Sequence, residues 1–331
     1  MDYFIGIDVS KNSLDLAVLK AGNLVLEQKI QNRALSIKSF LSEFLKLVPA
    51  SQVVVCMEHT GIYNAVALEV FWKKKIKICL EPALRIKQSQ GMVRGKNDKV
   101  DAFRIASYAF KNQLELTYWR PQRAIIQKMH ALLSQRDRLI RVKVMLEVPL
   151  RESIGFVESS IVKELDRNSR RALTGIKKDL NAIEKQLDIL ILQDQTLKTQ
   201  VEQITSVPGV GPITAMNMVV STGEFTRITE AKKFACYAGV APFEHSSGTS
   251  IRGRARVSRL ANMTMKRLLH LAAMSAIQCS PDLKAFYRRK VEAGKNKMSV
   301  INAVRNKLIS RVFACVTQNR LYEKNYQHAL A

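Results

Sequence analysis

The sequence predicts an α/β domain at the N-terminus, then a helical coiled coil and a mostly α-helical C-terminal domain. Three observations support this fold class. Short apolar runs alternate with turn signals and helical periodicity up to about residue 111. A heptad repeat of apolar residues follows, and the last part of the chain is basic with helical periodicity. With 331 residues, the chain is long enough for several domains, which we expect at residues 1–150, 151–205 and 206–331.

The first domain has a recognisable order of elements. Three short strands joined by turns are expected first, and helices then alternate with strands. The expected strands are 3–10, 14–19, 24–30, 53–57 and 76–80, and the expected helices are 35–47 and 64–74. This is the order of the ribonuclease H-like fold, an α/β sheet of mixed direction.

Two of the apolar strands end on an acid. Asp8 closes the first strand and Glu58 closes the fourth. These strands are neighbours in the fold just named, so the two carboxylates are expected to converge. Like charges at close range need a cation between them, and Mg2+ prefers such oxygen ligands. For Asp8 alone, a simple exit into a turn is an equally good interpretation.

A second pair of acids opens a helix that runs to about residue 111. Asp98 and Asp101 are three residues apart and therefore share a face of its first turn. Taken alone, they could be an N-cap and a favourable charge at the helix dipole. Together with Asp8 and Glu58, they complete a set of four candidate metal ligands. Three basic neighbours are expected to contact phosphate: Arg94, Lys96 and Lys99.

Composition indicates a nucleic-acid partner. The formal net charge is +25, and from residue 251 onward 17 Lys and Arg stand against 3 Asp and Glu. No run of apolar residues is long enough to span a membrane, and no secretory signal is present. The five cysteines are scattered and odd in number, which favours reduced thiols in a cytoplasm over a zinc site or disulfides.

Three segments carry a resemblance to a known family: Gly6-Ile7-Asp8, Met57-Glu58-His59-Thr60-Gly61 and Asn97-Asp98-Lys99-Val100-Asp101-Ala102. They resemble the Asp-Glu-Asp-Asp (DEDD) motifs of bacterial insertion-sequence transposases, which carry a Holliday-junction-resolvase-like (RuvC-like) domain. This family includes bridge-RNA-guided recombinases and a pilin-gene invertase. The resemblance implies that the chain acts in the bacterial cytoplasm at the nucleoid, on donor and target DNA, with Mg2+ held by the four acids. It also implies a structured guide RNA, although use of such an RNA by this chain stays open.

The middle of the chain is helical. Residues 121–148 form a basic helical region, and apolar residues at alternating steps of three and four then run from Leu173 to Ile204, interrupted only by Asp194. This spacing predicts a coiled coil. It could pair two copies of the chain or fold back as an intramolecular hairpin, and we favour self-association. The resemblance implies a dimer or tetramer.

A glycine-rich turn follows the repeat. Gly209 and Gly211 precede a helix, and free backbone N–H groups at such a turn suit a phosphate. The turn resembles that of a helix-hairpin-helix DNA-binding element, although a plain turn between helices would need the same glycines.

A serine-rich segment precedes four arginines: Arg252, Arg254, Arg256 and Arg259. It could be a flexible surface turn, or it could hold a serine nucleophile assisted by guanidinium groups. The resemblance to the catalytic serine motif of the same transposases favours the nucleophile and points to Ser247, with the adjacent Ser246 as the alternative. A basic cluster in the helical tail is a further candidate nucleic-acid contact: Arg288, Arg289 and Lys290.

These features favour a DNA transposase or recombinase that cuts and rejoins strands with Mg2+-binding acids and a serine nucleophile. The alternative enzyme is a hydrolytic Holliday-junction resolvase or nuclease that uses only the acids. A non-enzymatic nucleic-acid-binding protein would explain the charge but not the positions of the acids.

Overall fold

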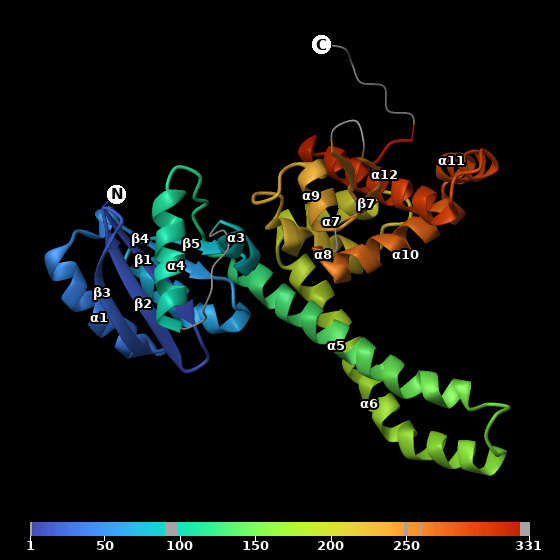
Figure 1. The fold of residues 1–331 in the computed structure, drawn as a ribbon. Helices are drawn as coiled ribbons and strands as arrows, with labels where there is room; N and C mark the ends of the chain where they lie inside the picture. Colours follow the sequence, from blue (N-terminus) through green and yellow to red (C-terminus); the bar gives the residue numbers. More distant parts are fainter. Residues whose placement is uncertain (1, 90–97, 248–250, 258–259, 325–331) are drawn as a thin grey trace. The chain divides into compact units, whose positions relative to one another are not determined.

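The computed structural model describes residues 2–89, 98–247, 251–257 and 260–324. By its internal contacts the chain divides into two compact units, Met1–Pro121 and Gln122–Ala331 (Figure 1). The first domain was expected to extend to residue 150. Instead, helix α5 (Ala124–Glu152) belongs to the second unit, because its apolar residues Ile126, Met129 and Leu133 are buried in that core. None of the helices in these described ranges combines the length and the hydropathy of a membrane-spanning segment.

The first unit contains a five-stranded mixed sheet. Its strands are β1 (Tyr3–Val9), β2 (Ser13–Lys20), β3 (Asn23–Gln31), β4 (Val53–Glu58) and β5 (Lys77–Glu81). The order across the sheet is β3-β2-β1-β4-β5. The first three strands pair antiparallel, whereas β4 and β5 run parallel to β1. This topology confirms the predicted ribonuclease H-like fold.

Helices cover both faces of the sheet, because the strands alternate between two cores. On one face, Ile5 and Ile7 pack with α1 (Ala34–Leu47) and α2 (Ala65–Lys73). On the other face, Phe4 packs with α4 (Asp98–Lys111), and α3 (Ala83–Gln88) adds Ile86. We call this second side the α4 face.

The second unit is mostly helical. After α5 it contains α6 (Ser159–Leu192), α7 (Gln195–Thr205), α8 (Pro212–Thr222), α9 (Ala231–Tyr237), α10 (Met263–Cys279), α11 (Pro281–Glu292) and α12 (Lys297–Thr317). Between α9 and α10, an antiparallel pair of strands is formed by β6 (Pro242–Ser247) and β7 (Ile251–Val257). This strand pair was not predicted from the sequence, which indicated only a serine-rich turn followed by arginines.

The predicted heptad segment is not one continuous helix. It is divided between α6 and α7, and α5 and α6 lie side by side as a long hairpin (Figure 1). Ile183 and Leu187 of α6 are buried in the same core as residues of α5, and Arg136 of α5 forms an ion pair with Glu184 at 2.7 Å. Within one chain, α6 therefore pairs with α5 as an intramolecular hairpin, which was the alternative expectation, and self-association of two chains through this hairpin stays a prediction.

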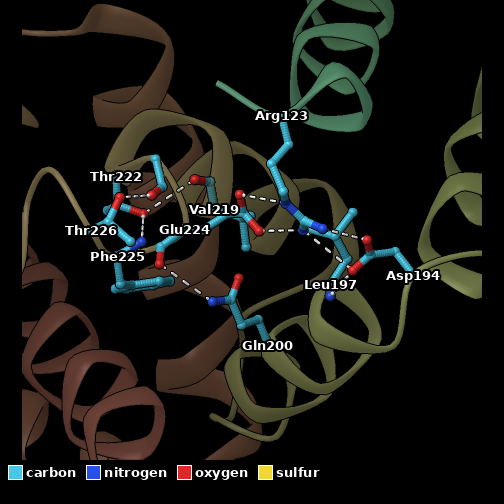
Figure 2. Close-up of polar contacts among 10 residues, drawn as sticks. Arg123, Asp194, Leu197, Gln200, Val219, Thr222, Glu224, Phe225 and Thr226 are labelled. Atoms are coloured by element: carbon cyan, nitrogen blue, oxygen red, sulfur yellow. Dashed lines mark hydrogen bonds and ion pairs between the residues drawn. The ribbon is translucent and has the colours of Figure 1, made fainter. Parts of the chain in front are cut away.

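Asp194 explains the break. Its side chain accepts a hydrogen bond from the Leu197 backbone N–H at 2.9 Å and thereby caps α7. Arg123, the residue before α5, donates to Asp194 at 2.6 Å and also to both carboxylate oxygens of Glu224 (Figure 2). Because one guanidinium holds two carboxylates, the start of α5, the start of α7 and the turn after α8 are joined at a single point.

Candidate active site

Four carboxylates form a row across the α4 face, one on each of four neighbouring strands. Asp8 pairs in register with Asp15, and Glu58 pairs with Glu81. The register of β1 and β4 pairs Ile7 with Met57, so Asp8 and Glu58 follow at the next position on the two strands. We call these four residues the acidic row: Asp15, Asp8, Glu58 and Glu81.

The outer members of the acidic row have basic partners. Lys29 lies 3.1 Å from Asp15, and Arg85 of α3 lies 3.2 Å from Glu81, while both carboxylates are almost fully buried. Burial, followed by the charge of Glu81, raises the pKa of Tyr108 to about 12, which is consistent with Glu81 facing α4. Since a buried carboxylate needs such compensation, Asp15 and Glu81 are explained as structural charges. Neither residue was predicted from the sequence to have a role.

The inner members, Asp8 and Glu58, are both half-buried. Among the described residues, none donates a hydrogen bond to the Glu58 carboxylate. The backbone around it is fixed, because the Glu58 carbonyl accepts from Asn64 Nδ2 at 2.9 Å and Asn64 Oδ1 accepts from the Thr60 N–H at 2.7 Å. The exit of β4 is therefore held in place while the carboxylate stays available for a ligand.

Helix α4 runs over β1 with its N-terminus toward Asp8. Phe110, near the end of the helix, contacts Phe4 with ring centroids 5.5 Å apart. A Cβ atom on Gly6 would meet backbone atoms of Ala102 and Ala106 at 2.2 Å, so only glycine allows this approach. Phe4 thus lies beside the end of α4 and Gly6 beside its middle, so Asp8 lies toward the first turn of α4.

That first turn carries the other two predicted acids. Asp98 is the first residue of α4, and its side chain lies outside the described residues. Asp101 Oδ1 accepts a hydrogen bond from Arg104 Nη1 at 2.8 Å, and its side chain is 28% exposed. The topology thus brings the backbone positions of all four predicted acids to the same end of the α4 face.

The donor chemistry fits a divalent cation, because carboxylate oxygens are the ligands that Mg2+ prefers. Among the side chains that the structure describes, no three His, Cys, Asp or Glu come together closely enough to hold a metal ion. That set lacks Asp98. The acids therefore agree with a metal site in type and in position on the fold, and metal binding stays a prediction.

Several other predicted site residues fall outside the described parts of the chain. These are Arg94, Lys96 and Arg259, and the side chains of Lys99, Ser247, Arg252, Arg254 and Arg256. Ser247 is the last residue of β6, and the backbone register pairs it with Ile251. Arg288 and Arg289 are exposed on α11, and Lys290 is half-buried.

The two predicted phosphate-binding glycines have different environments. Gly209 has φ +86°, and a Cβ there would meet backbone atoms of Ala272 and Ala276 at 2.5–2.6 Å, so close packing on α10 accounts for this glycine. Gly211 is exposed at the N-cap of α8, and a Cβ would meet nothing within 4 Å. A phosphate contact stays a prediction for both.

Two family models and several known proteins match this chain. Residues 5–153 match the model of the DEDD transposases of IS110 type, described as a transposase, and residues 201–288 match the transposase family IS116/IS110/IS902. The pilin gene-inverting protein of Moraxella bovis is 25% identical over 328 residues, covering 97% of this chain and 98% of that protein. An IS110 protein of 43.6 kDa from Streptomyces coelicolor is 33% identical over 152 residues, covering 46% and 36%.

Among solved structures, Thermus thermophilus RuvC in complex with a Holliday junction substrate is similar with a TM-score of 0.29 and 15% identity, covering 36% of this chain and 100% of that chain. The two family models are matched in chain order and together include well over half of the residues. The chain therefore belongs to the IS110 family of DEDD transposases and is a DNA transposase or recombinase.

Proposed function

We propose that this transposase cuts and rejoins DNA strands with Asp8, Glu58, Asp98 and Asp101 as Mg2+ ligands and Ser247 as nucleophile. The observation that carries the proposal is the meeting of β1, β4 and the first turn of α4 at one end of the α4 face. Asp15 and Glu81 are left out of the metal set because each is almost fully buried against a basic partner, whereas Asp101, which also pairs with Arg104, keeps a side chain that is 28% exposed.

A bound Mg2+ would polarise the scissile phosphate and offset its charge. The residues of the chain have separate tasks around it. Glu58 is held at the fixed end of β4 by Asn64, and Asp101 is oriented by Arg104. Because these contacts fix the backbone at Glu58 and the carboxylate of Asp101, little reorganisation of these two positions is needed when the substrate binds.

The serine step conserves the number of phosphodiester bonds. Ser247 Oγ attacks phosphorus, a new phosphoserine ester forms, and the bond to the leaving strand oxygen breaks while that oxygen gains a proton. In the second half, a strand hydroxyl attacks the phosphoserine and restores the free serine. A terminal position on β6, followed by a strand that contains three arginines, supports this role because guanidinium groups bind phosphate well.

Partners follow from the same proposal. DNA is the substrate, as donor and as target, and the excess of basic residues suits it. The chain is expected to act as a dimer or tetramer in the cytoplasm at the nucleoid, guided by a structured bridge RNA. The Moraxella relative is named for inverting a pilin gene, so inversion stands beside insertion as a candidate outcome for this chain.

The test separates covalent transfer from hydrolysis. Strand cleavage with Mg2+ is measured for wild type, S247A and the adjacent S246A, and the protein–DNA ester is captured by denaturing at intermediate times. We expect S247A to lose both the ester and religation, whereas S246A retains them. Undiminished cleavage by S247A, without any ester in wild type, would instead favour the hydrolytic resolvase or nuclease.

The acids are tested with D8N and D101N, which keep the shape of the side chains and remove their charge. Loss of cleavage in both variants with unchanged melting temperatures is expected. Full cleavage activity in either variant would remove that residue from the metal set.

A further inference from the structure

The second unit contains a buried arginine for which the active-site proposal has no use. Arg305 of α12 is 7% exposed. Its Nη1 donates to Asn302 Oδ1 at 3.4 Å, and its Nη2 contacts His270 Nδ1 of α10 and lies 3.8 Å from the sulfur of Met298. All three acceptors are neutral in these contacts, and the buried Nε–H has no acceptor among the described residues.

No carboxylate among the described residues pairs with Arg305. The contrast with Arg123 is informative, because Arg123 is more exposed and yet contacts two carboxylates. Burial alone accounts for the lowered pKa of the Arg305 guanidinium. An arginine stays charged in proteins, and a buried charge without a counterion is costly. This position therefore favours an anion supplied from outside the described residues.

The groups around Arg305 are arranged to receive such an anion. Because His270 Nδ1 faces a guanidinium N–H, it acts as an acceptor, and the ring proton is left on Nε2 as a further donor. Burial and the charge of Arg305 both lower the pKa of His270. The imidazole is therefore neutral at pH 7, and it can contribute its Nε2–H as a hydrogen-bond donor to an anion beside Arg305.

Asn302 connects this position to the strand that ends at Ser247. Its Nδ2 donates to the Val240 carbonyl at 2.7 Å, two residues before β6 begins. The same amide thus holds Arg305 through its oxygen and the entry of β6 through its nitrogen. An anion at Arg305 would lie in the part of the unit that supports the β6–β7 pair.

We propose that Arg305, with His270 beside it, forms a site for one phosphate group of the nucleic-acid backbone. Arginine is well suited to phosphate because several of its N–H groups can donate to the phosphate oxygens. The inference rests on the proposed function only in naming nucleic acid as the source of the phosphate, since the anion site itself follows from the buried guanidinium.

The first test uses inorganic phosphate on the whole protein, with ionic strength held constant by chloride. R305M removes the buried charge and keeps an apolar side chain of similar length, and K307M removes an exposed charge two residues along the same helix. We expect phosphate to raise the melting temperature of wild type and K307M but not of R305M. Without phosphate, R305M should melt above wild type, because an uncompensated buried charge has been removed.

Glu244 is the one acid of the second unit whose side chain lies outside the described residues, and E244Q therefore tests an internal partner. If both R305M and E244Q melt below wild type, and phosphate has no effect on wild type, Arg305 is an internal ion-pair residue and the proposal is wrong. If E244Q behaves as wild type, an internal pair with Glu244 is excluded and the external anion is supported.

The second test measures binding to a DNA duplex and an RNA duplex of equal length. R305M is expected to bind at least one of them about tenfold more weakly than K307M does, as the loss of one hydrogen-bonded charge contact predicts. The duplex that is affected identifies the source of the phosphate. Equal affinities of R305M and K307M for both would overturn the assignment to nucleic acid, whatever the fate of the serine mechanism, because binding needs no strand cleavage.

Discussion

Replacing Gly6 by alanine is expected to move α4 away from β1 and so separate the two halves of the candidate metal site. The added Cβ would lie 2.2 Å from the Ala102 carbonyl oxygen and from the Ala106 nitrogen, whereas ordinary contact begins at 3.4 Å. Both are backbone atoms, so no side-chain rotation can relieve the clash. The helix must shift by roughly 1 Å, the scale on which overpacking costs about 1–3 kcal/mol.

The same shift carries Asp98 and Asp101 away from Asp8 and Glu58. A misplacement of about 1 Å in a catalytic group can reduce the rate by about 100-fold. We therefore expect G6A to be destabilised and also to cleave DNA about 100-fold more slowly at temperatures well below its melting temperature. The assay combines thermal unfolding with single-turnover cleavage of a labelled DNA substrate in Mg2+.

Gly175→Ala provides the matched control. Gly175 lies in α6, where a Cβ would meet nothing within 4 Å, so G175A should gain about 0.5–1 kcal/mol from helix propensity and keep its cleavage rate. If G6A unfolds at the wild-type temperature, α4 does not approach β1 as closely as described. If G6A is destabilised but cleaves at the wild-type rate, the position of α4 does not control the chemistry.

Two further predictions concern the second unit. R123A leaves Asp194 and Glu224 without their shared cation and should reduce the free energy of unfolding by about 1–3 kcal/mol, discounted for the partial exposure of these side chains. The hydrogen bond from Arg123 lowers the pKa of Asp194, so this contribution is present above about pH 4 and should disappear as the pH falls through the lowered pKa. Urea titrations of wild type and R123A should therefore converge at acid pH. G209A should reduce the free energy of unfolding by about 2–3 kcal/mol, because its Cβ would clash with the backbone of α10 at a positive φ. Gly211→Ala should melt at the wild-type temperature, and equal melting temperatures for both glycine variants would contradict the packing role of Gly209.

The first unit was predictable because its local patterns agree with one another. Strands β1, β2 and β4 are short and mostly apolar, and turn residues separate β1 from β2 where the sheet needs them. The parallel pairing of β1 with β4 follows from the order of elements. Asp8 and Glu58 could therefore be placed on adjacent strands without coordinates.

Asp15 and Glu81 were missed because their role depends on cross-strand register. Asp15 lies inside a strand, and only its pairing with Asp8 and Lys29 places it in the acidic row. Glu81 did offer a signal, since it ends an apolar strand in the same way as Asp8 and Glu58. A rule that collects every acid at the end of a buried strand would have found it.

In the second unit, spacing alone was misleading. The apolar repeat continues in phase past Asp194, so a heptad count cannot detect that Asp194 ends one helix and caps the next. The cap residue also forms an ion pair with Arg123, which lies 71 residues earlier and which no local pattern connects to it. For the β6–β7 pair, the available signal was the alternation of arginines at positions 252, 254 and 256, which fits the period of a strand.

The acidic row also shows how a metal set can be chosen from an excess of acids. Four carboxylates on neighbouring strands repel one another, and the chain supplies a basic residue at each end of the row, Lys29 and Arg85. These ion pairs offset the charge of the two outer acids and hold their side chains in place without any ligand. The Glu58 carboxylate accepts no hydrogen bond from the described residues, so its negative charge is offset less than the charges of Asp15 and Glu81. A bound cation would therefore be stabilised most beside Glu58. The same logic applies with opposite sign to Arg305, a buried cation that lacks a carboxylate partner among the described residues. In both units, the charge that the described fold leaves uncompensated marks the position where a ligand of opposite charge would bind.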